Sequence, residues 1–265
     1  MIIRKSPDEL DKMRTAGRIV AGTIGRVLDA VAPGRTTLDL DRVAEQYIAE
    51  QDATPSFKGY RGASNTPFPA TICASVNEEI VHGIPSSDRR LEEGDLLSLD
   101  FGAIWQGFHS DSAVTVFVGG IAPSAEAERL VKTTEGALDA AISVIAPGGR
   151  LSDIGNAIET VARLEGMGIV REYGGHGIGR ALHEDPFIQN WGKPGRGPEL
   201  RPGLVVAVEP MLNFGGDETA VMPDGWTVVT ADGSLSAHFE HTVAVTPDGH
   251  EVLTARDWIA RGRTA

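Results

Sequence analysis

Two aspartates interrupt apolar segments that otherwise have the character of buried strands. Asp100 lies in LLSLDFGAIW (residues 96–105), and Asp111 lies in the following FHSDSAVTVFV (108–118). Apolar runs with β-branched residues are typical of buried strands, where an unpaired carboxylate costs several kcal/mol. Gln106-Gly107 fits a two-residue hairpin turn, which pairs position 100 with 113 and position 102 with 111. Both carboxylates then project from one face as diagonal neighbours, and they need a partner.

The second part of the chain repeats this arrangement. LEEGDLLSLD (91–100) resembles LRPGLVVAVE (200–209), which places Glu209 opposite Asp100, and HSDSAVTV (109–116) resembles HFEHTVAV (238–245), which places Glu240 opposite Asp111. Four carboxylates in one pocket would repel one another or take up protons, and divalent cations relieve that conflict. A salt-bridged core with Arg or Lys is the alternative, although these stretches contain no obvious basic partner.

Oxygen and imidazole ligands without thiolates suit Mn, Fe, Co, Ni or Zn, and a set of four carboxylates favours two ions that share bridging oxygens. Histidines in glycine- and proline-rich loops are candidates to complete the site: His82 in VHGIP, and His176 and His183 in GGHGIGRALHEDP. The other histidines are weaker candidates for the metal site. His109 and His238 are candidates for outer positions on the acid-bearing strand faces, His241 should point to the opposite face from Glu240, and His250 should be solvated.

The elements that position these groups also come in two sets. Ser6, followed by Pro7, is typical of a helix start, and the apolar spacing predicts a helix from there to APG at 32–34, then a second at about 38–51. The same order returns as helices at about 125–145 and 152–165, separated by APG at 146–148. We therefore expect one catalytic α+β domain built from related halves, about 1–118 and 119–255, with a C-terminal tail at 256–265.

Composition excludes several classes of protein. The single cysteine among 265 residues excludes an intrachain disulfide and a cysteine-rich zinc site. The apolar runs are far shorter than the ~20 residues of a membrane span, and the charged N-terminus does not resemble a signal peptide. A net charge of −13 argues against nucleic acid as a substrate. We expect a cytoplasmic monomer with no membrane partner.

Taken in order, the motifs closely resemble those of type I methionine aminopeptidases, metallopeptidases with the pita-bread fold. The resemblance covers nearly the whole chain and is carried by NEEIVHGIP, LDFG, FHSDSAVT, REYGGHGIGRALHEDP, VEPML and LSAHFEHT. It implies two pseudo-twofold-related α/β halves around a central antiparallel sheet, with two divalent ions inside. By this resemblance Asp100 binds one ion, Asp111 and Glu240 bridge both, and His176 and Glu209 bind the other.

The resemblance also implies an activity, the removal of N-terminal methionine from nascent proteins and peptides when the second residue is small, with the ribosome as a possible place of action. Glu209 would then act as both ligand and proton shuttle. His82 would lie near the scissile amide nitrogen, and His183 would stabilise the oxyanion. Cys73 and Trp226 match specificity-pocket positions and Tyr60 is a further candidate, with simple core packing as the alternative for each. Leu182, where relatives often carry an aromatic residue, and an apparent insertion at 62–67 leave the pocket's size open.

Two competing functions are compatible with parts of this pattern. An X-Pro aminopeptidase or prolidase would share the metal ligands, but such relatives usually carry a large extra N-terminal domain. A catalytically inactive pita-bread protein acting as a binding module should have lost ligands, whereas all five are present here.

Overall fold

The structure, a computed structural model, describes residues 1–62, 64 and 66–256. Its helices are α1 (Pro7–Ala30), α2 (Thr37–Glu50), the short 3₁₀ helix η1 (Val118–Gly120), α3 (Ala125–Ser143) and α4 (Leu151–Leu164). Its strands are β1 (Thr54–Pro55), β2 (Ile72–Val76), β3 (Glu79–Val81), β4 (Leu96–Trp105), β5 (Phe108–Phe117), β6 (Gly168–Ile169), β7 (Gly175–Gly177), β8 (Glu184–Ile188), β9 (Val205–Val208), β10 (Met211–Asn213), β11 (Thr219–Val221), β12 (Val228–Thr230), β13 (Ser236–His238), β14 (His241–Thr246) and β15 (Gly249–Val252). Apart from Arg256, the expected tail (256–265) lies outside the described residues.

The helix starts follow from capping residues that are visible in the sequence. Ser6 Oγ accepts a hydrogen bond from the Glu9 backbone N–H (3.4 Å), and the Glu9 carboxylate accepts one from the Ser6 N–H (3.0 Å). Thr36 and Asp39 form the same reciprocal pair at α2. These bonds satisfy backbone donors that the first turn of a helix leaves open. All four predicted α-helices are present, with ends within two residues of those expected.

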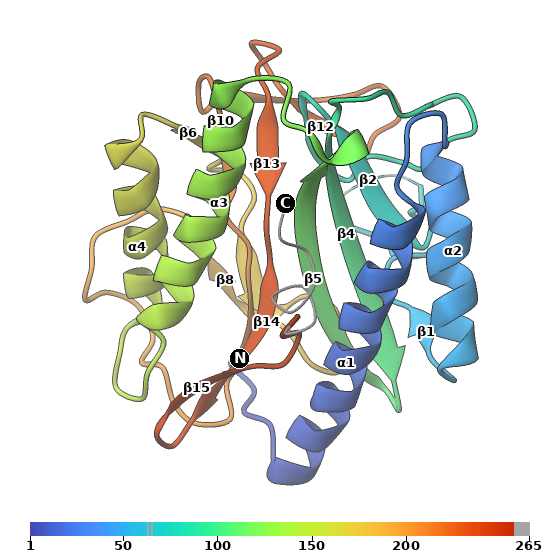
Figure 1. Cartoon of the computed structure of the whole chain (residues 1–265). Coiled ribbons are helices and arrows are strands. Elements are labelled where there is room, and N and C mark those ends of the chain that lie inside the picture. The colour runs from blue at the N-terminus through green and yellow to red at the C-terminus, as the bar shows by residue number, and fades with distance from the viewer. Residues whose placement is uncertain (63, 65, 257–265) are drawn as a thin grey trace.

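The helices lie as two pairs beside the strands. In Figure 1, α1 lies next to β4 and β5 with α2 on its outer side, and α3 lies next to β13 with α4 on its outer side. A single apolar cluster, with residues from all four helices and from strands of both parts of the chain, fills the space between these layers. The predicted mixture of helices and antiparallel strands is therefore confirmed. The division into related halves stays a prediction.

The strands form several small sheets instead of one continuous central sheet. In the described part of the chain they divide among four sheets, with the orders β1-β4-β2 (β5 pairs with β4), β13-β10-β6, β11-β12-β3 and β15-β14-β9-β7-β8. These strand pairings are all antiparallel. No helix in the described ranges is both long and apolar enough to cross a membrane.

The two acid-bearing regions differ in regularity. The β4–β5 hairpin is continuous, and its register pairs Asp100 with Ala113 and Gly102 with Asp111, as predicted. In the later part of the chain, β9 ends before Glu209-Pro210 and β13 ends before Phe239-Glu240. Proline lacks the N–H that a ladder needs, which accounts for the first break.

Hydroxyl groups replace ladder bonds where β5 meets β13 and β14. Thr115 Oγ1 donates to the His238 carbonyl (2.7 Å) and accepts from the His238 N–H (2.9 Å). Thr242 Oγ1 forms the same pair of bonds with Asp111, at 2.7 and 2.9 Å. This seam brings Asp111 and Glu240 together, and the Glu240 N–H donates to the Ala113 carbonyl at 3.0 Å.

Candidate metal centre and active-site pocket

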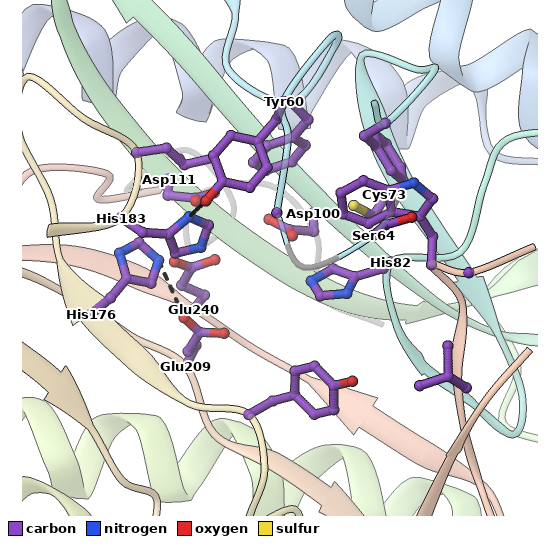
Figure 2. Close-up of a pocket in the computed structure, with 18 residues that line it drawn as sticks. Tyr60, Ser64, Cys73, His82, Asp100, Asp111, His176, His183, Glu209 and Glu240 are labelled. Carbon is purple, nitrogen blue, oxygen red and sulfur yellow. Dashed lines mark hydrogen bonds and ion pairs between the residues drawn. The ribbon is translucent and has the colours of Figure 1, made fainter. Parts of the chain in front are cut away.

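One cavity of about 460 Å³ brings the predicted ligands together. Figure 2 shows them converging from separate elements. Two come from the β4–β5 hairpin, one from β7, and two from the strand breaks after β9 and β13. The five predicted ligands are all among its lining residues: Asp100, Asp111, His176, Glu209 and Glu240.

The distances within this set suit metal binding. One ligand atom each from Asp111, His176 and Glu240 lie within 4.8 Å of one another. His176 Nε2 lies 3.4 Å from Glu209 Oε1. One oxygen each of Asp100, Asp111 and Glu240 is buried with no hydrogen-bond partner among the described residues. Buried unpartnered oxygens are costly, and a divalent cation would satisfy all three, so the donor set fits a metal centre.

Electrostatics support the same conclusion. Burial raises the pKa of Asp100 to about 7. Burial, reinforced by the neighbouring carboxylates, raises the pKa values of Asp111, Glu209 and Glu240 well above their usual range. Without a cation these groups therefore tend to hold protons, which a bound metal would displace.

His176 is held in the form that binds metals. Burial lowers its pKa to about 3, so the imidazole is neutral. Its Nδ1 lies 2.9 Å from the Gly177 carbonyl oxygen. A carbonyl can only accept, so Nδ1 carries the proton and Nε2 presents a lone pair towards the carboxylates.

The two other predicted histidines border the same cavity. His82 has a φ of 61°, a left-handed conformation that is uncommon for a residue other than glycine and frequent at functional sites. Burial lowers its pKa to about 4. The ring of His183 lies 4.2 Å from that of His176, and its Nδ1 lies 2.7 Å from the Tyr60 hydroxyl.

An apolar recess adjoins the carboxylates. Cys73 lies opposite Asp100 in the β2–β4 pairing, and burial raises the pKa of its thiol, which keeps it protonated. Trp226 packs edge-on against Phe68 with ring centroids 5.2 Å apart. Leu182 is also buried and lines the recess. Cys73 and Trp226 thus lie in the cavity wall as well as in an apolar cluster.

Comparison with known proteins agrees with this geometry. The sequence profile of "Metallopeptidase family M24" matches residues 11–247. The chain belongs to metallopeptidase family M24. "Methionine aminopeptidase 1" of Bacillus subtilis (strain 168) is 50% identical over 254 residues, which cover 96% of this chain and 99% of that protein.

Solved structures share the fold of this chain. The crystal structure of methionine aminopeptidase from Thermotoga maritima has a TM-score of 0.92 and 42% identity, and covers 96% of this chain and 99% of that one. The prolidase of Pyrococcus horikoshii has a TM-score of 0.74 at 21% identity, covering 96% of this chain and 64% of that one. At that identity the likeness to the prolidase shows the fold alone. The pita-bread fold and the predicted family are confirmed.

The remaining histidines of this M24 chain lie close to where they were expected. His238 is buried, with Nε2 3.9 Å from Glu209 Oε2, so it contacts the ligand set from outside. His109 instead pairs with the Ser56 hydroxyl at 3.0 Å. His241 faces away from the cavity towards Thr254 and Arg256. His250 is exposed, but its Nδ1 lies 2.9 Å from the Ile145 carbonyl oxygen, so it is anchored as well as solvated.

Three side chains that support the ligands were not predicted. Ser112 Oγ donates to the Glu240 carbonyl at 2.6 Å, and Asn190 donates to the Glu209 carbonyl at 3.0 Å. Arg256 donates to the carbonyls of Ala113 (3.1 Å) and Glu240 (3.4 Å). This arginine comes from the predicted tail, where no local pattern distinguishes it. Within the described ranges no Lys or Arg forms an ion pair with the four carboxylates, which argues against the salt-bridged alternative, although the Arg256 charge acts to lower the pKa of Glu240 against the larger effect of burial.

Proposed function

We propose that this chain is a metal-dependent aminopeptidase that removes N-terminal methionine when the second residue is small. The observation that carries the proposal is the adjacency, in one cavity, of a carboxylate–imidazole set and an apolar recess lined by Cys73 and Trp226. An unbranched thioether packs well against sulfur and aromatic groups. The Bacillus subtilis relative, which shares half of this sequence, is named for the same activity.

The ligand set would be Asp100, Asp111, His176, Glu209 and Glu240, holding two divalent ions. The unpartnered buried oxygens and the neutral His176 support this assignment. When bound, such ions lower the pKa of water and polarise a carbonyl group, which is the chemistry that peptide hydrolysis needs. Mn, Fe, Co, Ni and Zn all suit these oxygen and nitrogen donors.

The chain's own residues would handle protons and charge. Glu209, whose pKa is raised by burial, would take a proton from the attacking water and deliver it to the leaving amine. His183 would donate a hydrogen bond to the oxyanion that develops on the carbonyl oxygen. His82, which lies across the carboxylates from His183 in Figure 2, would contact the scissile amide nitrogen.

The substrates would be the N-termini of nascent polypeptides. We further propose that the chain acts in the cytoplasm, as a monomer and near the ribosome, because nascent chains first expose their N-termini there. Co-sedimentation with translating ribosomes, compared with salt-washed empty ribosomes, tests that placement. Absence from both fractions would contradict ribosome docking and leave the peptidase assignment intact.

The deciding experiment is mass-spectrometric detection of residues released from Met-Ala-Ser, Met-Leu-Ser and Ala-Pro-Ser. The protein is first stripped of metal and then titrated with Mn, Fe or Co. Metal-dependent cleavage of Met-Ala-Ser alone is expected. Cleavage of Ala-Pro-Ser would support the X-Pro alternative, and no cleavage with any metal would support the binding module.

A further inference from the structure

The hydroxyl of Tyr60 contacts the ring of His183. Oη and Nδ1 are 2.7 Å apart, and the ring centroids are 5.1 Å apart at an interplanar angle of 47°. Figure 2 shows this bond above Glu240 and Glu209, with His183 between Tyr60 and these two carboxylates. The sequence assigned Tyr60 to the pocket wall alone. The bond gives its hydroxyl a separate task.

The protonation states of both groups restrict how they share hydrogen. Near neutral pH an imidazole is mainly uncharged, with one N–H and one bare nitrogen. Burial raises the pKa of Tyr60, so the phenol keeps its proton. Either the phenol donates to Nδ1 and Nε2 carries the ring proton, or Nδ1–H donates to the phenol and Nε2 is bare.

The proposed role of His183 selects the first arrangement. The ring borders the cavity that contains the ligand set, and a ring that donates a hydrogen bond to an oxyanion there needs its proton on the nitrogen that Tyr60 leaves free. That nitrogen is Nε2, because Nδ1 lies against the phenol. The phenol then supplies the proton that Nδ1 lacks. In a neutral histidine the partner of one nitrogen determines the state of the other.

We propose that Tyr60 is a positioning residue that holds His183 as its Nε2–H tautomer. The inference rests on the proposed peptidase function, in which His183 donates to the developing oxyanion. A donor must already carry its proton and point at the site before charge develops there. A histidine in the wrong tautomer would present a lone pair to that charge and raise the barrier.

Tyr60 is anchored independently of His183. Its N–H donates to the Phe57 carbonyl (2.8 Å), and its own carbonyl accepts from the Phe68 N–H (2.9 Å). A Cβ at Gly62 would lie only 3.3 Å from the Tyr60 ring and 3.4 Å from Trp226, so a glycine at this position lets the backbone of residue 62 approach both rings.

His183 has its own support on the other side of the contact. Leu182 is buried, and the Glu184 carboxylate accepts from the backbone N–H groups of Arg180 (2.8 Å) and Ala181 (3.2 Å). Glu184 also pairs with Lys5 at 2.7 Å. Both partners are thus held by other contacts, and loss of the hydroxyl should change the hydrogen-bond state of His183 more than its place.

The kinetic test compares Tyr60→Phe with wild type on Met-Ala-Ser. Phenylalanine keeps the ring and removes the hydroxyl, so kcat should fall about tenfold while KM stays within about twofold. In a His183→Ala background the same substitution should change kcat less than twofold. Tyr47→Phe, in α2 and away from the cavity, is the matched control. An equal loss of kcat in both backgrounds, or a raised KM with unchanged kcat, would overturn the proposal.

A second readout needs no turnover. In zinc-loaded protein labelled with ¹⁵N-histidine, the His183 signals, assigned by their absence from His183→Ala, should show the Nε2–H tautomer. Tyr60→Phe should shift them towards a mixture. An Nδ1–H tautomer in the wild type would overturn the proposal even if the peptidase is active. A protein that cleaves no methionine peptide yet shows the expected tautomer would instead contradict the proposed function alone.

Discussion

The two regions that supply the acids hold them in different ways. Asp100 and Asp111 lie within a continuous hairpin of two ten-residue strands, whose pairing determines their direction. Glu209 and Glu240 lie at breaks between short strands, where the ladder is interrupted. A strand interior restricts a side chain to one face of the sheet, whereas a break leaves its direction to other contacts.

Those other contacts come largely from side chains. Ser112, Asn190 and Arg256 donate to the carbonyls of the two glutamates. The glutamates thus depend on side chains distant in sequence, whereas the hairpin pairing directs the aspartates, with Thr242 bonded to the Asp111 backbone from outside the hairpin. Breaks also free the chain to approach the hairpin closely, which places a carboxylate from each region in one candidate metal-binding cluster.

The largest loss of activity should come from substitution of a glutamate at a strand break. Glu209→Gln removes both a charged oxygen and the group proposed to move the proton, so kcat should fall by about three orders of magnitude. Steady-state kinetics at saturating metal, with elemental analysis of the same sample, measure the change. Glu199→Gln, at an exposed site, is the control. Turnover close to that of wild type would exclude Glu209 from the chemistry.

A residue beside the ligands but outside the set should affect rate without affecting metal content. His183→Ala should lower kcat about a hundredfold, the usual cost of one oxyanion donor. The metal-to-protein ratio should stay at the wild-type value. Loss of metal in this variant would mean that His183 is needed for metal binding, and it would contradict the role proposed for this residue.

The same contrast explains what could be predicted from the sequence. The hairpin register follows from a period of two and a Gln-Gly turn, both local signals, and the positive φ values at Gln106 (47°) and Gly107 (79°) show that turn. Helix starts follow from caps such as Ser6, which are also local. The convergence of the four acids was predictable because the same short pattern occurs twice.

Long-range side-chain bonds were not predictable in this way. The Tyr60–His183 contact joins residues 123 positions apart, and Arg256 reaches Ala113 across 143. Neither partner carries a periodicity or turn signal that refers to the other. The division of the expected central sheet has a similar cause, because the broken strands exchange ladder bonds for hydroxyl groups such as that of Thr242.

Metal-free protein should lose stability as the pH rises from 6.5 to 8. Folded-state pKa values of the four acids are raised, to about 7 for Asp100, so above pH 4 the folded state binds more protons than the unfolded chain. The free energy of unfolding then falls with rising pH. The slope is roughly 1.4 kcal/mol per pH unit for each acid that is still protonated in the folded state but ionised in the unfolded chain. Neutral buried histidines such as His176 make stability rise with pH instead, but only below pH 6.5, the usual pKa of histidine.

Urea unfolding with a chelator at both pH values measures this change. Asp100→Asn should reduce the slope, because asparagine carries no proton to lose. Metal-loaded protein should show a smaller decline, since bound cations keep the acids ionised in the folded state. Equal or greater stability of the metal-free protein at pH 8 would mean that the acids are already ionised without metal.

The smallest expected effect is on metal affinity, and it tests the hydrogen bonds that hold a glutamate at a strand break. Two serines of β5 provide the comparison. Ser112 donates to the Glu240 carbonyl, whereas the hydroxyl of Ser110, buried on the same face of β5, has no partner among the described residues. Ser112→Ala should weaken metal affinity a few-fold in chelator competition, since Glu240 loses one of its supports. Ser110→Ala should leave affinity unchanged, because no hydrogen bond is lost. If both substitutions weaken affinity equally, packing within β5 would matter more than the bond to Glu240, and the two regions would hold their acids by the same means.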